Sequence, residues 1–177
     1  HYQQPYSESE LATVPDNEKV ETITYFNALG KATQTQTFDV KTERIWARHI
    51  LYDSQGRPAL QTLSAPISDR DKTTPETFQY KEDFIRNKAG AVFTSADFEG
   101  SPALEENPKE VQSLATTYDL GRQYSAHNTA EERQDITTRP YTRTLYSTLN
   151  PGSVLKIIGG NKIDTNADGM GDAWKQG

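Results

Sequence analysis

The chain contains no cysteine and only one methionine among its 177 residues. The absence of cysteine excludes disulfides, thiol chemistry and zinc–thiolate sites. The sequence also has no apolar run of the roughly 18 to 20 residues that a membrane-spanning helix requires, so we expect no membrane span. Hydrophobic residues make up 33% of the chain, and the mean hydropathy is −0.82. These values are low for a self-sufficient core, and they lead us to expect a segment that packs against something larger.

An excess of basic residues is missing as well. The chain carries 25 acidic and 19 basic residues, which give a net charge of −6, and the two signs are interspersed along the sequence. A protein that binds nucleic acid or an anionic membrane through its surface charge is typically basic on the binding face. This balance therefore argues against both kinds of partner.

The common signatures of hydrolytic sites are also absent. Neither H-E-x-x-H nor H-x-x-E-H occurs, and no G-x-S-x-G elbow accompanies His127, which could pair with Asp119 or Ser125 as a base. His49 falls within a predicted strand, where we interpret it as a packed or half-exposed residue. Carboxylate pairs lie in charged, turn-rich stretches typical of a solvated surface: Glu82 with Asp83, Glu105 with Glu106, and Glu131 with Glu132. We expect no enzymatic activity and assign no catalytic residue.

The strongest pattern that is present is a hairpin over residues 44–66. Residues 45–52 mix β-branched and aromatic side chains, which favours a strand. Asp53 can accept hydrogen bonds from backbone amides two residues on, and Gly56 can adopt a positive φ. We predict a loop of about four residues and a second strand over residues 59–63. The first strand should place on one face Ile45, Ala47, His49 and Leu51, and on the other Trp46, Arg48, Ile50 and Tyr52.

The same pattern recurs along the chain. Residues 25–31 (YFNALGK) match residues 51–57 (LYDSQGR), with the two glycines 26 residues apart, at positions 30 and 56. Residues 117–122 (TYDLGR) form a third copy that is one residue short, and residues 146–150 (YSTLN) form a weaker fourth copy with Asn150 as the left-handed residue. Periods of 20 to 50 residues are typical of repeat architectures, in which each unit buries its apolar face against its neighbours.

The Y-D-x-x-G-R pattern followed by a strand resembles the YD repeat of Rhs and teneurin-type proteins, over residues 21–158. The resemblance implies a mainly β fold, with antiparallel hairpins of YD-repeat type that form part of a curved β-sheet shell. It implies a structural segment of a secreted or cell-surface bacterial protein, whose shell encapsulates or presents a C-terminal cargo or toxin. The expected partners are then the remaining parts of the same Rhs-like polypeptide or complex. The autoproteolytic aspartate motif of that family is not present here.

We predict three regions along the chain. Residues 1–19 are polar and proline-containing, and we expect an extended arm; because the chain begins at His1, we interpret it as a fragment or a processed product. Residues 20–160 should form eight to ten short strands with nearly no helix, and residues 161–177 a separate tail. Within the β region we expect a loop over 64–77, a further hairpin turning at 87–90 between strands 78–85 and 91–94, and a strand-ending turn at Gly159 and Gly160.

The tail contains the sharpest chemical motif, residues 164–172 (DTNADGMGD). Oxygen-bearing side chains at alternate positions with a central glycine resemble the calcium loops of thrombospondin type-3 repeats and the first half of an EF-hand loop. The resemblance implies Ca²⁺ as a stabilising ligand. The predicted metal ligands are Asp164, Asn166, Asp168, the carbonyl of Met170, and Asp172. Lys175 stands where an EF-hand loop has its bidentate glutamate, and the alternative is a simple Asp/Asn/Gly turn.

A second function stays open from the residues. The chain could be a calcium-stabilised extracellular binding module that recognises a glycan or a protein partner through exposed tyrosines. We interpret the aromatic residues as repeat packing in preference to a sugar platform. They are Tyr25, Phe26, Trp46, Tyr52, Tyr118, Tyr124, Tyr141 and Tyr146.

Overall fold

The computed structural model describes most of the β region and little of the two ends. The described residues are 13–14, 19–67, 77–87, 89–99, 115–129, 136–137, 139–163 and 173–176, the last four and residues 160–163 by their backbone alone. Two predictions lie outside them: most of the extended arm and the calcium-like loop over 164–172. Among the described residues, no helix is long and apolar enough to cross a bilayer.

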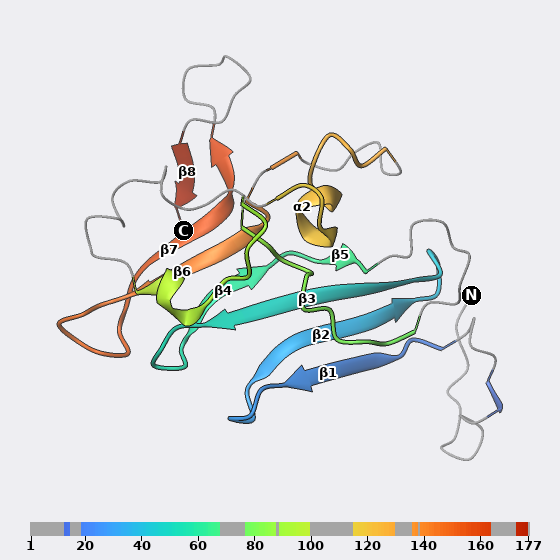
Figure 1. Ribbon diagram of the computed structural model, residues 1–177, viewed down its shortest axis with the longest axis horizontal. Coiled ribbons are helices and arrows are strands. Elements are labelled where there is room, and N and C mark those ends of the chain that lie inside the picture. Colours follow the sequence, from blue (N-terminus) through green and yellow to red (C-terminus); the bar gives the residue numbers. More distant parts are fainter. Residues whose placement is uncertain are drawn as a thin grey trace.

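The described residues form one antiparallel sheet with little helix, as the sequence predicts (Figure 1). The hydrogen-bonded order is β1-β2-β3-β4-β6-β7-β8, and β5 pairs with β3 beside β4. The prediction of a mainly β fold is therefore confirmed. The strands are β1 (Thr22–Phe26), β2 (Ala32–Asp39), β3 (Arg44–Tyr52), β4 (Pro58–Thr62), β5 (Ala65–Pro66), β6 (Tyr141–Tyr146), β7 (Val154–Ile163) and β8 (Ala173–Gln176).

Strand β3 is the centre of the sheet and shows the predicted two-faced alternation. Its residues Ile45, Ala47 and His49 are buried, while Trp46 and Arg48 between them stay accessible. Along one side, β3 pairs with β2. Along its other side it pairs with β4 at residues 50–52 and with β5 at residues 46–47. The apolar alternation of this strand therefore decides which face of the sheet becomes the core.

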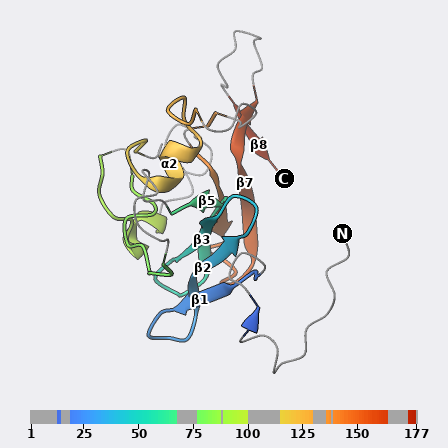
Figure 2. The ribbon, with the colours of Figure 1, turned by 90° about the vertical axis from the view of Figure 1, so that its right-hand side faces the viewer.

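The core lies on one face of the sheet, under residues 77–99 and α2 (Asp119–Gln123) (Figure 2). Phe84 and Leu120 from these covering segments are fully buried, and the Leu120 amide donates to the Phe84 carbonyl at 3.2 Å. A short 3₁₀ turn, η3 (Ser95–Phe98), lies over the same face. The buried cluster comprises Ile45, Ala47, Leu60, Ala65, Ile67, Phe84, Ile85, Leu120, Tyr124 and Tyr141.

Two glutamines of β2 hold residues 77–99, which we call the covering segment, against the sheet. Gln34 and Gln36 are buried, at 1% and 0% exposure. The Gln34 side chain donates to the Lys81 carbonyl and accepts from the Lys81 amide, both at 3.0 Å, and Gln36 donates to the Gln79 carbonyl at 2.7 Å. These amide side chains pair with the backbone of residues 79–81 as a neighbouring strand would, which satisfies their buried polar groups except Oε1 of Gln36.

The prediction that residues 117–122 form a third copy of the hairpin turn is wrong, because the chain forms the helix α2 there. Asp119 is the first residue of that helix, after Tyr118 at the N-cap. In the turn between β3 and β4, Gly56 lies three residues after Asp53. Here Gly121 follows Asp119 by only two. With one residue missing, the glycine cannot occupy the left-handed position, and the helix instead buries Leu120.

Other local predictions also need correction. Residues 78–85 and 91–94 are not strands, because the glutamine side chains and the core cluster, and not a strand ladder, hold this segment to the sheet. Gly159 and Gly160 lie inside β7 and do not end it; the register of β7 against β8 shifts there, between Ile158 and Lys162, which is where glycine is tolerated in a strand. The predicted loop over 64–77 begins with the two residues of β5.

Candidate functional site

Three turns of the chain share one hydrogen-bond pattern, and we call them the Asx corners: residues 27–31, 53–57 and 87–91. In the corner at 53–57, the Asp53 amide donates to the Arg57 carbonyl, and the Gly56 amide donates to the Asp53 carbonyl. The Asp53 carboxylate accepts from the amides of Gln55 and Arg57 at 3.0 and 2.8 Å. Asn27 and Asn87 make the same four bonds in their own corners.

The glycine of each Asx corner closes the turn in the left-handed region. Gly30, Gly56 and Gly90 have φ values of 71°, 71° and 81°. A tight turn followed by a left-handed residue and a bulge is a standard three-residue hairpin loop. The predicted hairpins at residues 30 and 56 are thereby confirmed, and the turn at 87–90 is confirmed without its flanking strands.

The corner between β6 and β7 is a longer variant. Ser147 takes the acidic position, where its hydroxyl accepts from the amides of Leu149 and Asn150, and the Ser147 amide donates to the Ser153 carbonyl. The left-handed residue is Gly152, with φ 94°, and not Asn150 as the sequence suggested. Glycine adopts this conformation without a Cβ clash, so it takes the position from asparagine when both are near.

The turns of the hairpins β1–β2, β3–β4 and β6–β7 lie at the same end of the strands (Figure 1). The first two are joined by a lysine and a tyrosine. Lys31 donates through Nζ to the Gly56 carbonyl and lies over the ring of Tyr52, 5.6 Å from its centroid. The Tyr52 hydroxyl donates to the Ala32 carbonyl at 2.7 Å. Burial raises the pKa of Tyr52, which favours the protonated hydroxyl that donates this bond.

The second and the last hairpin are joined in the same way. Arg57 lies over the ring of Tyr146, with its guanidinium carbon 4.3 Å from the centroid. The Tyr146 hydroxyl donates to the Pro58 carbonyl at 3.0 Å. Each link therefore combines a cation–π contact with a hydroxyl-to-carbonyl hydrogen bond between neighbouring hairpins. We call this series of links the tyrosine ladder.

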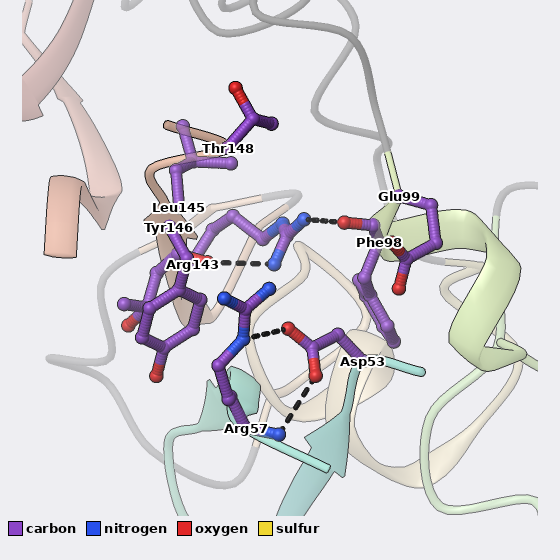
Figure 3. Close-up of a pocket in the computed structure, with 9 residues that line it drawn as sticks. Asp53, Arg57, Phe98, Glu99, Arg143, Leu145, Tyr146 and Thr148 are labelled. Atoms are coloured by element: carbon purple, nitrogen blue, oxygen red, sulfur yellow. Dashed lines mark hydrogen bonds and ion pairs between the residues drawn. The ribbon is translucent and has the colours of Figure 1, made fainter. Parts of the chain in front are cut away.

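A small polar pocket lies behind the ladder (Figure 3). Figure 3 shows the guanidinium groups of Arg57 and Arg143 pointing into it, with the carboxylate of Asp53 bonded to Arg57 Nε at 2.7 Å. Arg143 donates to the carbonyls of Ala59, Thr144 and Phe98 at 2.8–2.9 Å. The pocket has a volume of about 70 Å³, well below the roughly 300–1,000 Å³ of ligand pockets. Its geometry favours a role in bracing the corner.

Replacing the corner glycines should separate backbone strain from the loss of the ladder. We expect Gly30→Ala to lower the free energy of unfolding by about 1–2 kcal/mol, because alanine is strained at a positive φ. Gly56→Ala should cost about 1 kcal/mol more, because its Cβ would lie 2.6 Å from Lys31 Nζ and displace the lysine from its carbonyl. The measurement is urea unfolding of both variants. Equal losses would show that Lys31 contributes nothing to the corner.

His49 is the one histidine of the described residues that is buried, at 4% exposure. Its ring contacts the rings of Tyr80 and Phe84, and Nε2 lies 3.4 Å from the Tyr80 hydroxyl. Burial lowers the pKa of His49 from 6.5 to about 4, because the imidazolium form loses its hydration. The prediction of a packed or half-exposed strand residue agrees with this placement.

The depressed pKa of His49 predicts an acid-sensitive fold. As the pH falls through 6.5, the unfolded chain takes up a proton on His49 and the folded chain does not until about pH 4. The free energy of unfolding should therefore decrease over this window, by about 2 kcal/mol at pH 5. A His49→Asn variant should show a flatter dependence between pH 7 and pH 5 in urea unfolding. An unchanged slope would contradict the assignment.

The other residues considered for chemistry do not assemble around a common point. His127 is exposed, and its backbone amide, not its ring, contacts the Ser125 hydroxyl at 3.2 Å, while Asp119 begins α2. Among the described residues, no group of three or more histidine, aspartate or glutamate side chains is placed to hold a metal ion. The predicted calcium ligands, residues 164–172, lie outside the described part, between the paired residues Ile163 and Ala173.

Several of the aromatic residues interpreted as repeat packing make packing contacts, in different ways. Tyr52 and Tyr146 form the ladder, Tyr141 is buried in the core, and Tyr118 lies against Gly90 of the third Asx corner, 3.6 Å from a Cβ built there. Phe26, which stands at the same corner position as Tyr52, is 62% exposed. Sequence reasoning missed Arg143, for which no local pattern exists.

The sheet and its corners define an antiparallel β protein in which two hairpins share one turn design and a third uses a longer variant of it. The chain belongs to the family described as a domain of unknown function (DUF6443), which matches residues 1–105 and thus more than half of its length. Comparisons with curated proteins and with solved structures gave no match.

Proposed function

We propose that this chain is a structural segment of a secreted Rhs/YD-repeat (teneurin-like) bacterial protein, in which it forms part of a β-shell around a C-terminal cargo or toxin. The observation that carries the proposal is the tyrosine ladder. Two successive hairpin contacts use the same tyrosine-to-carbonyl bond and the same cation over the ring. A contact that repeats from one hairpin to the next can continue to further hairpins, which is what a scaffold of stacked units requires.

The accessible face of the sheet and the lean composition support the same role. Thr22 and Thr24 of β1 face Thr37 and Thr35 of β2 there, with hydroxyl oxygens 3.1 and 3.4 Å apart. A two-layer domain of this size normally covers both the sheet and its edges, yet β1 and β7 carry exposed Ile23, Phe26, Leu155 and other large apolar side chains. A larger polypeptide would supply the missing contacts.

The scaffold role can be tested in the longer polypeptide that the proposal requires. We would introduce a protease site at the end of the chain, cleave it, and measure whether residues 1–177 stay bound to the remainder. We expect retention, and we expect Asp53→Ala to reduce it because this carboxylate organises the central corner. Val92→Ser, at an exposed position outside the corners, is the matched control. Release of a stable monomer after cleavage would overturn the proposal.

A second candidate function is a calcium-stabilised extracellular binding module. The observation that favours it is a hollow of about 420 Å³, a volume within the range of ligand pockets. Threonine, glutamine and arginine side chains of four strands line it, among them Thr35, Arg48, Gln61 and Thr142. If this function holds, the isolated chain should be a stable monomer that binds a glycan or a protein, and Arg48→Ala should abolish that binding on a glycan array.

The calcium proposal concerns the tail and has its own test. Titrating Ca²⁺ into the chain should raise its melting temperature, because a metal that binds only the folded loop stabilises it by mass action. Asp168→Ala should remove the rise, since it deletes a predicted ligand at the centre of the motif. Thermal unfolding with Ca²⁺ and with EDTA measures the difference. A melting curve that EDTA leaves unchanged would contradict the assignment.

A further inference from the structure

The tyrosine ladder follows a rule that can be read from the pairing of the strands. In each hairpin, the residue before the corner pairs across a register shift with the residue after it: Phe26 with Ala32, Tyr52 with Pro58, and Tyr146 with Val154. The tyrosine of the next hairpin then donates to the carbonyl of that second residue. Tyr52 donates to Ala32, and Tyr146 donates to Pro58. Val154 is the next residue in this series.

The ladder has a defined direction. At its first end, Phe26 stands where the later hairpins have tyrosine, and phenylalanine has no hydroxyl to donate. At its other end, Val154 presents the position that accepts a hydroxyl in the two links before it. Among the described residues, the series therefore starts at β1 and has no further link after β7.

The edge of β7 beside Val154 has the features of a surface that binds a strand. β8 pairs with β7 only from Ile158 onward, and among the described residues no other strand lies on that side of residues 154–157. Val154, Leu155 and Ile157 are 52%, 57% and 43% exposed, and Leu149 in the adjoining corner is almost fully exposed. Apolar side chains along an unpaired strand edge favour the addition of another strand.

We propose that the edge of β7 over residues 154–157 binds a further β-hairpin whose first strand ends in a tyrosine before an Asx corner. That strand runs antiparallel to β7, in line with β8, and its tyrosine hydroxyl donates to the Val154 carbonyl. Ser153 stands where the earlier links have Lys31 and Arg57, so this link has the hydrogen bond without the cation. The inference rests on the proposed scaffold role and names the partner of its open end.

A second copy of this chain fits the edge less well. In a head-to-tail arrangement the strand that a copy would offer is β1, whose other edge pairs with β2, and its corner residue is Phe26. Because phenylalanine cannot donate to Val154, the link that defines the ladder would be missing. In a two-fold arrangement the copy would offer its own β7, whose corner residue Ser147 follows a tyrosine that already donates to Pro58. The occupant that satisfies the rule is therefore a tyrosine-bearing hairpin.

The test uses the full chain and a hairpin peptide with the sequence of residues 45–62, cyclised through a linker because an isolated two-stranded hairpin is barely stable. We expect the fluorescently labelled peptide to bind, with the amides of residues 154–157 becoming protected from hydrogen exchange. A peptide with phenylalanine in place of its tyrosine should bind about fivefold to tenfold more weakly, the effect of one hydrogen bond. In the chain, Ile157→Lys should weaken binding at least tenfold, because lysine on an edge strand blocks pairing.

The matched control is Ile23→Lys on β1, at 39% exposure against 43% for Ile157; it should leave binding unchanged. Equal affinity of the tyrosine and phenylalanine peptides, protection at residues 22–26 instead of 154–157, or no binding at millimolar peptide would each overturn the inference. Self-association of the chain that both lysine variants abolish would assign the edge to a second copy, and would overturn it as well. Retention of the chain by its cleaved polypeptide, with no peptide binding, would leave the scaffold role standing and reject this edge alone.

Discussion

Replacing Asp53 by alanine should lower the free energy of unfolding by about 3–5 kcal/mol, the range for removing one partner of a buried ion pair. The Asp53 side chain is 3% exposed and accepts hydrogen bonds from two backbone amides and from Arg57 Nε. Alanine would leave all three donors unbonded. It would also leave the Arg57 guanidinium without its carboxylate partner in the turn between β3 and β4. Urea unfolding of the folded monomer measures the change.

The sharpest control for this prediction is Asp53→Asn. Asn27 and Asn87 show that an amide oxygen closes the same corner with the same two backbone bonds. The asparagine variant should therefore keep the turn and lose only the charged bond to Arg57, for a loss of about 1.5–3 kcal/mol. If the alanine and asparagine variants were equally unstable, the ion pair and not the corner geometry would be the source of the stability.

Replacing Arg143 by methionine should lower the free energy of unfolding by about 3 kcal/mol, because three carbonyl groups lose a charged donor at once. This side chain is 8% exposed and joins β4 through Ala59, β6 through Thr144, and the covering segment through Phe98. Its guanidinium carbon also lies 4.8 Å from the centre of the Phe98 ring. Methionine keeps most of the apolar stem, so the loss reports the guanidinium group itself.

Two further measurements separate the roles of Arg143. Arg143→Lys retains the charge but not the planar fork, and should lose about half as much stability as Arg143→Met. Hydrogen exchange at residues 95–99 should accelerate more than exchange in β2, because only the former segment is tied by the Phe98 bond. A methionine variant as stable as the original chain would show that apolar packing replaces the bonded arginine at this position.

The hairpins could be predicted from the sequence because their signals are local. Asp53 and Gly56 specify a turn through their own side-chain chemistry, and the alternation over residues 45–52 specifies which face is buried. The same local reasoning failed at residues 117–122, where one missing residue changes a corner into the first turn of α2. Spacing, and not the presence of the Tyr-Asp pair, decides whether a corner forms.

The covering segment and the ladder could not be predicted because their partners are distant in the sequence. Residues 32–39 alternate threonine and glutamine, both polar, so nothing local indicates that the glutamines are the buried side. Their burial follows from carbonyl and amide groups of residues 79 and 81. In the same way, the bond from Tyr146 to Pro58 joins residues 88 positions apart. The tyrosines were predicted to pack, but the rule that joins them needed coordinates.

The attachment of the covering segment through Gln34 and Gln36 has a consequence for how the protein responds to its surroundings. Amide side chains carry no net charge, so neither dissolved salt nor acidification weakens these bonds directly. The tyrosine ladder, in contrast, depends on the charges of Lys31 and Arg57 and on the carboxylate of Asp53. Rising ionic strength therefore loosens the links between hairpins before it releases the layer over the core.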